Sequence, residues 1–382
     1  MAGLTQPLTY CSNIHPGEGW ADVMNNLNTH VLEVKQRLED QAQRPFPLGL
    51  RIAGQAAAEI DAKAVAEFQE WCHRHDAYLL TINGFPYGAF HNERVKEKVY
   101  LPDWREAERV RYTQSLGDIA VKLQPDANTL SISTVPVAFK EGFSESDWPA
   151  VLDNIQSVLA HFVNLKQSTG VHVTLAIEPE PACVLETTDE LLAFFQRVRP
   201  RLTMEQNAHL GVCFDCCHQA VEFEEPEECL QRLAEAEIPI AKVQVSSALQ
   251  ANTPDEVGRL LRFNEPVYLH QAVARTSDGK LHAFSDLPDF EEALSEGLTP
   301  EECRVHFHVP IFLEHLGDCG TTQPFLKQLL PLLDPNVPLE VETYSFGVLP
   351  DHLRTDSVGE SIARELSWVS SLLAESVTQP AR

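Results

Sequence analysis

The chain has 382 residues, with 29 Lys and Arg against 56 Asp and Glu, so its formal net charge is −27. Hydrophobic residues make up 43% and charged residues 22%, a globular composition that excludes a disordered or collagen-like chain. The excess of acids excludes a broad basic face for nucleic acid or anionic membranes, because binding phosphates requires clustered Lys and Arg.

Short apolar segments alternate with amphipathic ones along the chain, which predicts strands alternating with helices. The predicted strands are 8–15, 47–53, 77–84, 129–135, 171–180, 210–215, 240–248 and 338–345. The predicted helices are 20–43, 58–75, 103–124, 146–168, 187–206, 226–236 and 322–334. Eight strands with helices between them indicate a (β/α)8 TIM barrel of the α/β class. A doubly wound open sheet is the alternative, but neither a GxGxxG nor a Walker-type glycine loop supports it.

The spacing of these elements is irregular in one place, since about ninety residues separate the last two strands. We expect an insertion at about 250–320, between strands seven and eight, that carries a short hairpin and an HxH segment on the catalytic face. Residues 1–370 are then a single barrel domain, and 371–382 are a polar C-terminal tail.

Three features predict a cytoplasmic protein. No apolar run approaches the ~20 residues of a membrane span. The first 19 residues lack the basic start and apolar stretch of a secretory signal. The nine cysteines are odd in number and lie mostly in apolar runs, which indicates reduced thiols. Cys213, Cys216 and Cys217 could suggest a zinc cluster, but no second cysteine pair with suitable spacing follows.

Acidic residues at the ends of three predicted strands are the strongest functional signal. Glu178, Asp215 and Glu342 lie in or at the ends of predicted strands five, six and eight, and a barrel brings the carboxyl ends of its strands together. Their oxygens would suit one Mg²⁺ or Mn²⁺, or Zn²⁺ with imidazoles nearby. The alternative is an ion pair for each acid, but only Arg51 and Lys242 lie in predicted strands.

Two further acids call for separate predictions. Glu180 follows Pro179, so we expect it in the loop past strand five, with a supporting or solvated role. Glu340 shares a strand face with Glu342 and lies about 6–7 Å deeper, where it could pair with Lys242 or Arg51.

Histidines and aromatic residues lie near the same strand ends. His218 follows Asp215 by three residues, and the spacing of His306 and His308 lets two imidazoles address one ion or substrate. For the other histidines, packing or backbone capping is at least as good an interpretation: His15, His91 and His270. An apolar wall could come from Phe85, Tyr87, Phe90 and Tyr344, for which packing at the barrel rim is equally plausible.

Several motifs resemble the xylose-isomerase-like barrel superfamily. GVCFDCCH (211–218) is similar to its strand-six motif, VTLAIEP (173–179) to its fifth-strand Glu motif, and PLEVET (338–343) to its last strand. RVHFHVPIF (304–312) resembles the loop that adds a metal- or substrate-binding His. The superfamily includes sugar isomerases, sugar-phosphate isomerase/epimerases and DNA-repair enzymes of the endonuclease IV type. The resemblance implies a metal set of Glu178, Asp215, Gln244 and Glu342.

A closer resemblance spans nearly the full chain. Segments 10–20, 82–104 and 339–350 are similar to EboE-type metabolite traffic proteins of bacterial secondary-metabolite clusters. This implies partner proteins of a biosynthetic cluster. One departure from the superfamily is Gln244, which stands where a metal-binding His is usual. An amide oxygen favours Mg²⁺ or Mn²⁺ over Zn²⁺ and puts a trinuclear zinc site in doubt.

Together these signals predict a metal-dependent isomerase or epimerase acting on a sugar, a polyol or a sugar-like metabolite. One divalent ion would bind the substrate oxygens, and Glu178 and Glu342 would move protons with help from His218. Substrate-binding residues would be His15, His91, His306, His308 and Tyr344. The alternatives are a non-catalytic barrel that binds and hands on a metabolite and, disfavoured by the charge and Gln244, a metal-dependent phosphodiesterase of the endonuclease IV type.

Overall fold

The computed structural model describes residues 6–38, 43–91, 95–349, 354 and 357–378. Eight parallel strands form its central sheet in the order β1-β14-β7-β6-β5-β4-β3-β2. A parallel bridge between Cys11 and Gly49 joins the two ends of the sheet, so the strands close into a barrel. The strands are β1 (Leu8–Tyr10), β2 (Phe46–Arg51), β3 (Ala77–Asn83), β4 (Thr129–Thr134), β5 (His172–Ile177), β6 (Leu210–Asp215), β7 (Ile240–Val245) and β14 (Leu339–Val341).

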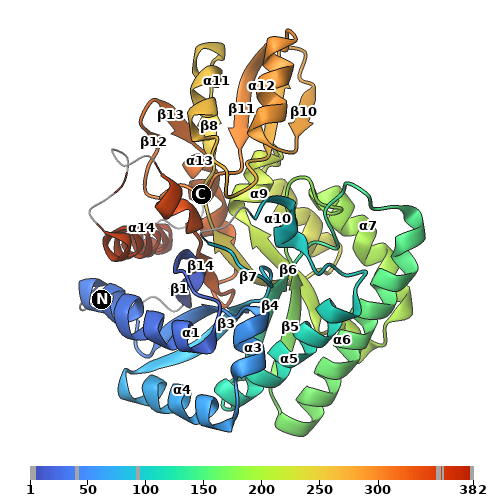
Figure 1. Cartoon of the computed structure of the whole chain (residues 1–382), viewed down its shortest axis with the longest axis vertical. Helices are drawn as coiled ribbons and strands as arrows, with labels where there is room; N and C mark the ends of the chain where they lie inside the picture. The colour runs from blue at the N-terminus through green and yellow to red at the C-terminus, as the bar shows by residue number, and fades with distance from the viewer. Residues whose placement is uncertain (1–5, 39–42, 92–94, 350–353, 355–356, 379–382) are drawn as a thin grey trace.

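Helices surround this barrel (Figure 1). They are α1 (Trp20–Asn26), α2 (Leu32–Leu38), α3 (Gly54–Glu59), α4 (Ala62–Arg74), α5 (Ala107–Leu123), α6 (Trp148–Thr169), α7 (Thr188–Val198), α8 (Met204–Asn207), α9 (Cys216–Val221), α10 (Pro226–Glu235), α13 (Gln323–Leu329) and α14 (Val358–Thr378). Each of the eight predicted barrel strands is present, which confirms the TIM barrel and rules out the open sheet.

Helix α6 shows how the sequence sets these elements. Pro149 lies in its first turn, where a missing N–H costs nothing, and Gly170 ends it with φ +83°. Val151, Ile155 and Phe162 recur at helical spacing and are fully buried. The helix therefore presents one apolar face to the barrel.

The chain between β7 and β14 forms a second sheet of six strands, in the order β10-β9-β11-β8-β13-β12. With α11 (Pro254–Leu260) and α12 (Leu287–Ser295) it projects above the barrel in Figure 1. Its strands are β8 (Leu249–Ala251), β9 (Ala272–Thr276), β10 (Leu281–Phe284), β11 (Pro300–Val305), β12 (His315–Leu316) and β13 (Cys319–Thr321). The HxH segment follows β11 directly, so this sheet holds two histidines over the barrel.

The C-terminal helix α14 continues through Thr378, so residues 371–378 of the predicted tail are helical, and Leu373 is buried. Residues 379–382 lie outside the described residues. Within the described ranges, no helix is both long and apolar enough to cross a membrane.

Candidate metal centre at the barrel mouth

Three carboxylates converge where the barrel strands end. Glu178 follows β5, Asp215 ends β6 and Glu342 follows β14, and their side chains are 1%, 0% and 4% exposed. One oxygen from each lies within 4.8 Å of the others. The strands are parallel, so their carboxyl ends meet on one face of the barrel. The structure therefore brings together the three acids that the sequence singles out.

Positive charge does not neutralise this group. Lys242 lies deeper in the barrel and pairs with Glu340 at 2.5 Å, whereas Arg51 pairs with Glu18 at 2.7 Å. Among the described residues, Glu178 Oε2 and Asp215 Oδ2 have no hydrogen-bond partner. Buried acids with unpaired oxygens are costly, and a divalent cation would remove that cost. The donor set thus fits a metal ion.

The pKa values follow from this burial. Burial raises the pKa of Glu178 to about 8, and the nearby charges of Asp215 and Glu340 add to the shift, while Lys242 opposes it. Burial likewise raises the pKa of the Glu342 carboxyl well above its usual range. Without a cation, these two carboxyls hold protons that exposed glutamates would lose at neutral pH.

Two asparagines hold Glu342 in place. Asn13 Nδ2 donates to Glu342 Oε1 at 2.7 Å, and Asn83 Nδ2 donates to the same oxygen at 3.2 Å. Both asparagines are buried. The sequence places both asparagines at the ends of the first and third strands. It does not mark them as site residues, because a neutral amide at a strand end has no charge that needs a partner.

The Gln244 amide completes the oxygen-rich face. With its nitrogen turned toward Glu340, it donates to Oε2 and to the backbone oxygen of Glu340, both at 3.1 Å. The amide oxygen then takes the position 3.5 Å from Glu342 Oε1. Two acceptor oxygens facing each other at this distance suit a shared cation.

Three buried histidines lie beside the carboxylates. His218 is in α9, and His306 and His308 follow β11. His306 Nε2 lies 3.2 Å from Nε2 of both His218 and His308. Burial lowers the pKa of His308 to about 4 and the pKa of His306 well below its usual value. His306 and His308 of the HxH segment therefore lie next to His218 of the strand-six motif.

Glu180 is not solvated, contrary to one of the two roles that the sequence suggests. It is 5% exposed, and its Oε1 accepts a hydrogen bond from Tyr100 at 2.8 Å. Burial raises its pKa well above the usual range. The loop after Pro179 folds on itself, because Glu180 N donates to the backbone oxygen of Leu185 at 3.0 Å and Cys183 N donates to that of Glu180 at 3.2 Å. Glu180 is therefore buried although it lies past the strand.

The remaining predicted histidines lie elsewhere. His15 stacks on His30 with ring centroids 4.2 Å apart and faces a separate small cavity. His91 donates through Nε2 to the backbone oxygen of Asn13 and so supports a residue that holds Glu342. His270 Nε2 lies 2.9 Å from Glu265 Oε1.

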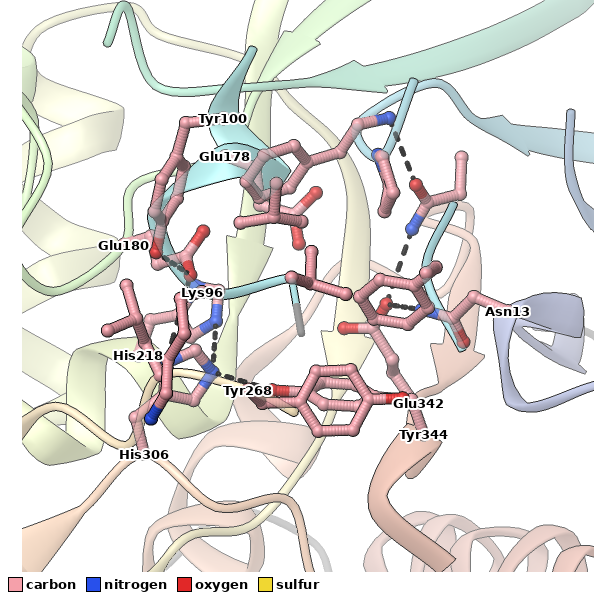
Figure 2. Close-up of a pocket in the computed structure, with 17 residues that line it drawn as sticks. Asn13, Lys96, Tyr100, Glu178, Glu180, His218, Tyr268, His306, Glu342 and Tyr344 are labelled. Atoms are coloured by element: carbon pink, nitrogen blue, oxygen red, sulfur yellow. Dashed lines mark hydrogen bonds and ion pairs between the residues drawn. The ribbon is translucent and has the colours of Figure 1, made fainter. Parts of the chain in front are cut away.

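A cavity opens beside the acids and histidines, as Figure 2 shows. Its volume is about 50 Å³. Aromatic side chains line it, as predicted for Phe85, Phe90 and Tyr344, together with Tyr100 and Tyr268. Tyr87 instead donates to Glu108 on α5 and is not among the lining residues.

Comparisons with known proteins agree with this geometry. A family model described as "Xylose isomerase-like TIM barrel" matches residues 46–275, and no curated protein matches. A xylose isomerase-like TIM barrel protein from Mycobacterium smegmatis, in complex with magnesium, is 10% identical with a TM-score of 0.56, covering 99% of this chain and 100% of that one. A xylose isomerase domain protein from Planctomyces limnophilus is 14% identical with a TM-score of 0.50, covering 91% and 93%. The chain belongs to the xylose isomerase-like TIM barrel family.

Proposed function

We propose that this protein is a metal-dependent isomerase or epimerase for a sugar, a polyol or a sugar-like metabolite. The observation that carries the proposal is the convergence of Glu178, Asp215 and Glu342, buried and under-neutralised, beside a cavity with an aromatic wall. The metal set would be these three acids with the Gln244 oxygen, holding one Mg²⁺, Mn²⁺ or Zn²⁺. When bound, this ion would polarise a substrate carbonyl and stabilise the negative charge that develops on it.

The chain's own residues would move the proton. Glu178 and Glu342 come from strands that lie apart in the barrel, so one can take a proton from the carbon beside the carbonyl while the other returns it. His218, His306 and Tyr344 line the cavity and would orient hydroxyl groups.

Solvent exchange tests this reaction directly. Purified protein would be incubated in D₂O with Mg²⁺ or Mn²⁺ and a panel of aldoses and ketoses, and proton NMR would follow deuterium entry beside the carbonyl. We expect exchange with at least one compound and at least ~100-fold less with Glu342→Gln. The exposed residue Glu291 on α12 provides the matched control Glu291→Gln, which should keep full exchange.

A second function is a barrel that binds and hands on a metabolite with partner proteins, as the EboE-like segments suggest. The cavity volume does not separate the two functions, because a sugar enters about 50 Å³ only if the surrounding chain moves, in either of them. A compound that raises the melting temperature without any deuterium exchange would favour this function. Cleavage of an abasic DNA duplex with added Zn²⁺ would instead support the phosphodiesterase alternative.

A further inference from the structure

The cavity at the barrel mouth has unpartnered oxygens in its wall. Among the described residues that line it, three buried side-chain atoms have no hydrogen-bond partner, and all three are oxygens: Asn13 Oδ1, Glu178 Oε2 and Glu180 Oε2. The oxygen of Glu178 belongs to the proposed metal set, whereas those of Asn13 and Glu180 have no role there. A buried polar atom costs free energy until a partner reaches it, so this wall favours a ligand that donates hydrogen bonds.

Glu180 is held with one oxygen fixed and the other free. Its Oε1 accepts from the hydroxyl of Tyr100 at 2.8 Å, and that hydroxyl accepts from Gln271 Nε2 at 2.8 Å. The side chain is 5% exposed and lines the cavity beside Tyr100 (Figure 2). It is not part of the close group formed by the three acids of the metal set. Its Oε2 is therefore available to a ligand while an ion occupies that set.

The donors of the cavity wall already serve other side chains. Lys96 Nζ lies 2.5 Å from Asp286 Oδ2, and the hydroxyl of Tyr268 lies 2.9 Å from His91 Nδ1. The other hydroxyl and amide donors of the described wall are bonded in the same way: Asn13, Asn83, Tyr100 and Tyr344. A phosphate or carboxylate group of a ligand would meet acids there, and the only lysine or arginine in this part of the described chain is already paired.

The charge of the site points the same way. Glu178, Asp215 and Glu342 carry three negative charges when they hold a metal ion, and a divalent ion compensates two of them. One negative charge remains before Glu180 is counted, so a cationic group on the ligand lowers the electrostatic energy and an anionic group raises it. Aromatic side chains in the wall add to the attraction, because the faces of such rings favour cations: Phe85, Phe90, Tyr100, Tyr268 and Tyr344.

We propose that Glu180 binds a positively charged amino group, and that the substrate class is therefore an amino sugar and not a sugar phosphate. An ammonium group has three N–H donors and no acceptor, which matches a wall with free oxygens and engaged donors. A hydroxyl group would satisfy Glu180 Oε2 but would leave the negative charge of the site uncompensated. This inference rests on the proposed function for the reaction, but ammonium binding at Glu180 does not depend on turnover.

A small probe tests the site directly. Crystals of the full chain grown with Mg²⁺ would be soaked in methylammonium or, for comparison, in methanol, which has a similar size and no charge. We expect methylammonium with its nitrogen about 2.7–2.9 Å from Glu180 Oε2, and no methanol at that position. A cavity without methylammonium, or one that takes both probes equally, would overturn the inference.

Binding in solution gives a second test. D-glucosamine, D-galactosamine and D-mannosamine would each be compared with the parent hexose by calorimetry in the presence of Mg²⁺. We expect at least one amine to bind at least ~10-fold more tightly than its parent, because a charge-assisted hydrogen bond replaces a neutral one. Tighter or equal binding of the parent in every pair that binds would contradict the inference, and the crystal result decides where neither member binds.

The variant Glu180→Gln keeps the oxygen that accepts from Tyr100 and removes the charge. It should lose the preference for the amine and keep the affinity for the parent hexose, whereas Glu291→Gln, at an exposed residue of α12, should change neither. A merely structural role for Glu180 would instead weaken both ligands equally, which would refute the inference.

The D₂O experiment separates this inference from the proposed reaction. Exchange with a hexosamine that exceeds exchange with its parent hexose supports both. Exchange confined to sugar phosphates would overturn the amino-sugar class and leave the proposed reaction standing. Methylammonium bound at Glu180 without exchange of any compound would leave the amine site standing and reject the proposed reaction.

Discussion

The ammonium group of Lys242 lies 2.5 Å from the carboxylate of Glu340, and both side chains are fully buried inside the barrel. The pair lies one layer below the converging acids, since Glu340 precedes Glu342 by two residues on the same face of the last strand. Gly49 makes room for it, because a Cβ at that position would lie 2.1 Å from Glu340 Oε1. Lys242 also lowers the pKa of Glu178 and Glu342 through its charge.

Removing one member of this pair should destabilise the fold strongly. In Lys242→Met the buried Glu340 loses its counter-charge, and we expect the free energy of unfolding to fall by about 3–5 kcal/mol in urea denaturation. The double variant Lys242→Met/Glu340→Met should recover most of that loss, because it leaves no unpaired charge. Equal losses in the single and double variants would contradict this explanation.

The asparagines that hold Glu342 should tune metal affinity. In Asn83→Ala the Glu342 carboxylate keeps its charge but loses one of the donors that orient it, so Mn²⁺ binding measured by calorimetry should weaken about 10–100-fold. Asn25→Ala, at an exposed position in α1, is the matched control and should bind Mn²⁺ as the unchanged protein does. Unaltered affinity in Asn83→Ala would show that Glu342 needs no such support.

Stability should fall in mild acid because of a histidine far from the metal set. His172 at the start of β5 stacks on His209 with centroids 4.1 Å apart, and burial together with that neighbour lowers its pKa to about 4. The unfolded chain takes up the proton near pH 6.5 and the folded one near pH 4, so stability is full above pH 6.5 and decreases as the pH falls toward 4.

The variant His172→Gln removes that difference in proton binding. We expect its melting temperature to change less between pH 7 and pH 4.5 than that of the unchanged protein, as measured by calorimetry. His73→Gln, at an exposed histidine of α4, should leave the pH dependence as it is. A slope unaltered by His172→Gln would assign the acid sensitivity to other groups.

An ion pair at the cavity should control how quickly the metal leaves. Lys96 Nζ lies 2.5 Å from Asp286 Oδ2 and ties the segment of Val95, Val99 and Tyr100, which line the cavity, to the residues before α12. Lys96→Gln weakens this tie, so a chelator in excess should strip bound Mn²⁺ several-fold faster. Lys98→Gln, two residues away and exposed, should release the metal at the original rate.

The barrel and its acids could be predicted because burial leaves a clear mark on the sequence. Near-continuous apolar runs reveal strands covered on both faces, and a charged residue at the end of such a run stands out. The break in the predicted helix 20–43 was not visible: α1 passes through a π-helical turn at Leu27–Val31 into α2, which ends at Leu38. Residues 39–42 lie outside the described residues.

Tertiary contacts account for the other differences. Asn13 and Asn83 gain their importance only when strands distant in sequence bring them to Glu342. The loop after Pro179 buries Glu180, and Tyr87 turns toward α5, because loop paths depend on neighbours that local sequence patterns do not show. The types of side chain at the strand ends predict a metal centre. Which of those side chains face the cavity depends on how the loops pack.

The position of His306 and His308 beyond β11 has a consequence for the classification of related barrels. The barrel supplies the acids and His218, while an appended sheet supplies the other two imidazoles. A relative with a shorter connection between its last two barrel strands would keep the carboxylates and lack the two imidazoles that correspond to His306 and His308. The length of that connection therefore offers a way to sort such relatives into two chemical classes from genome data alone.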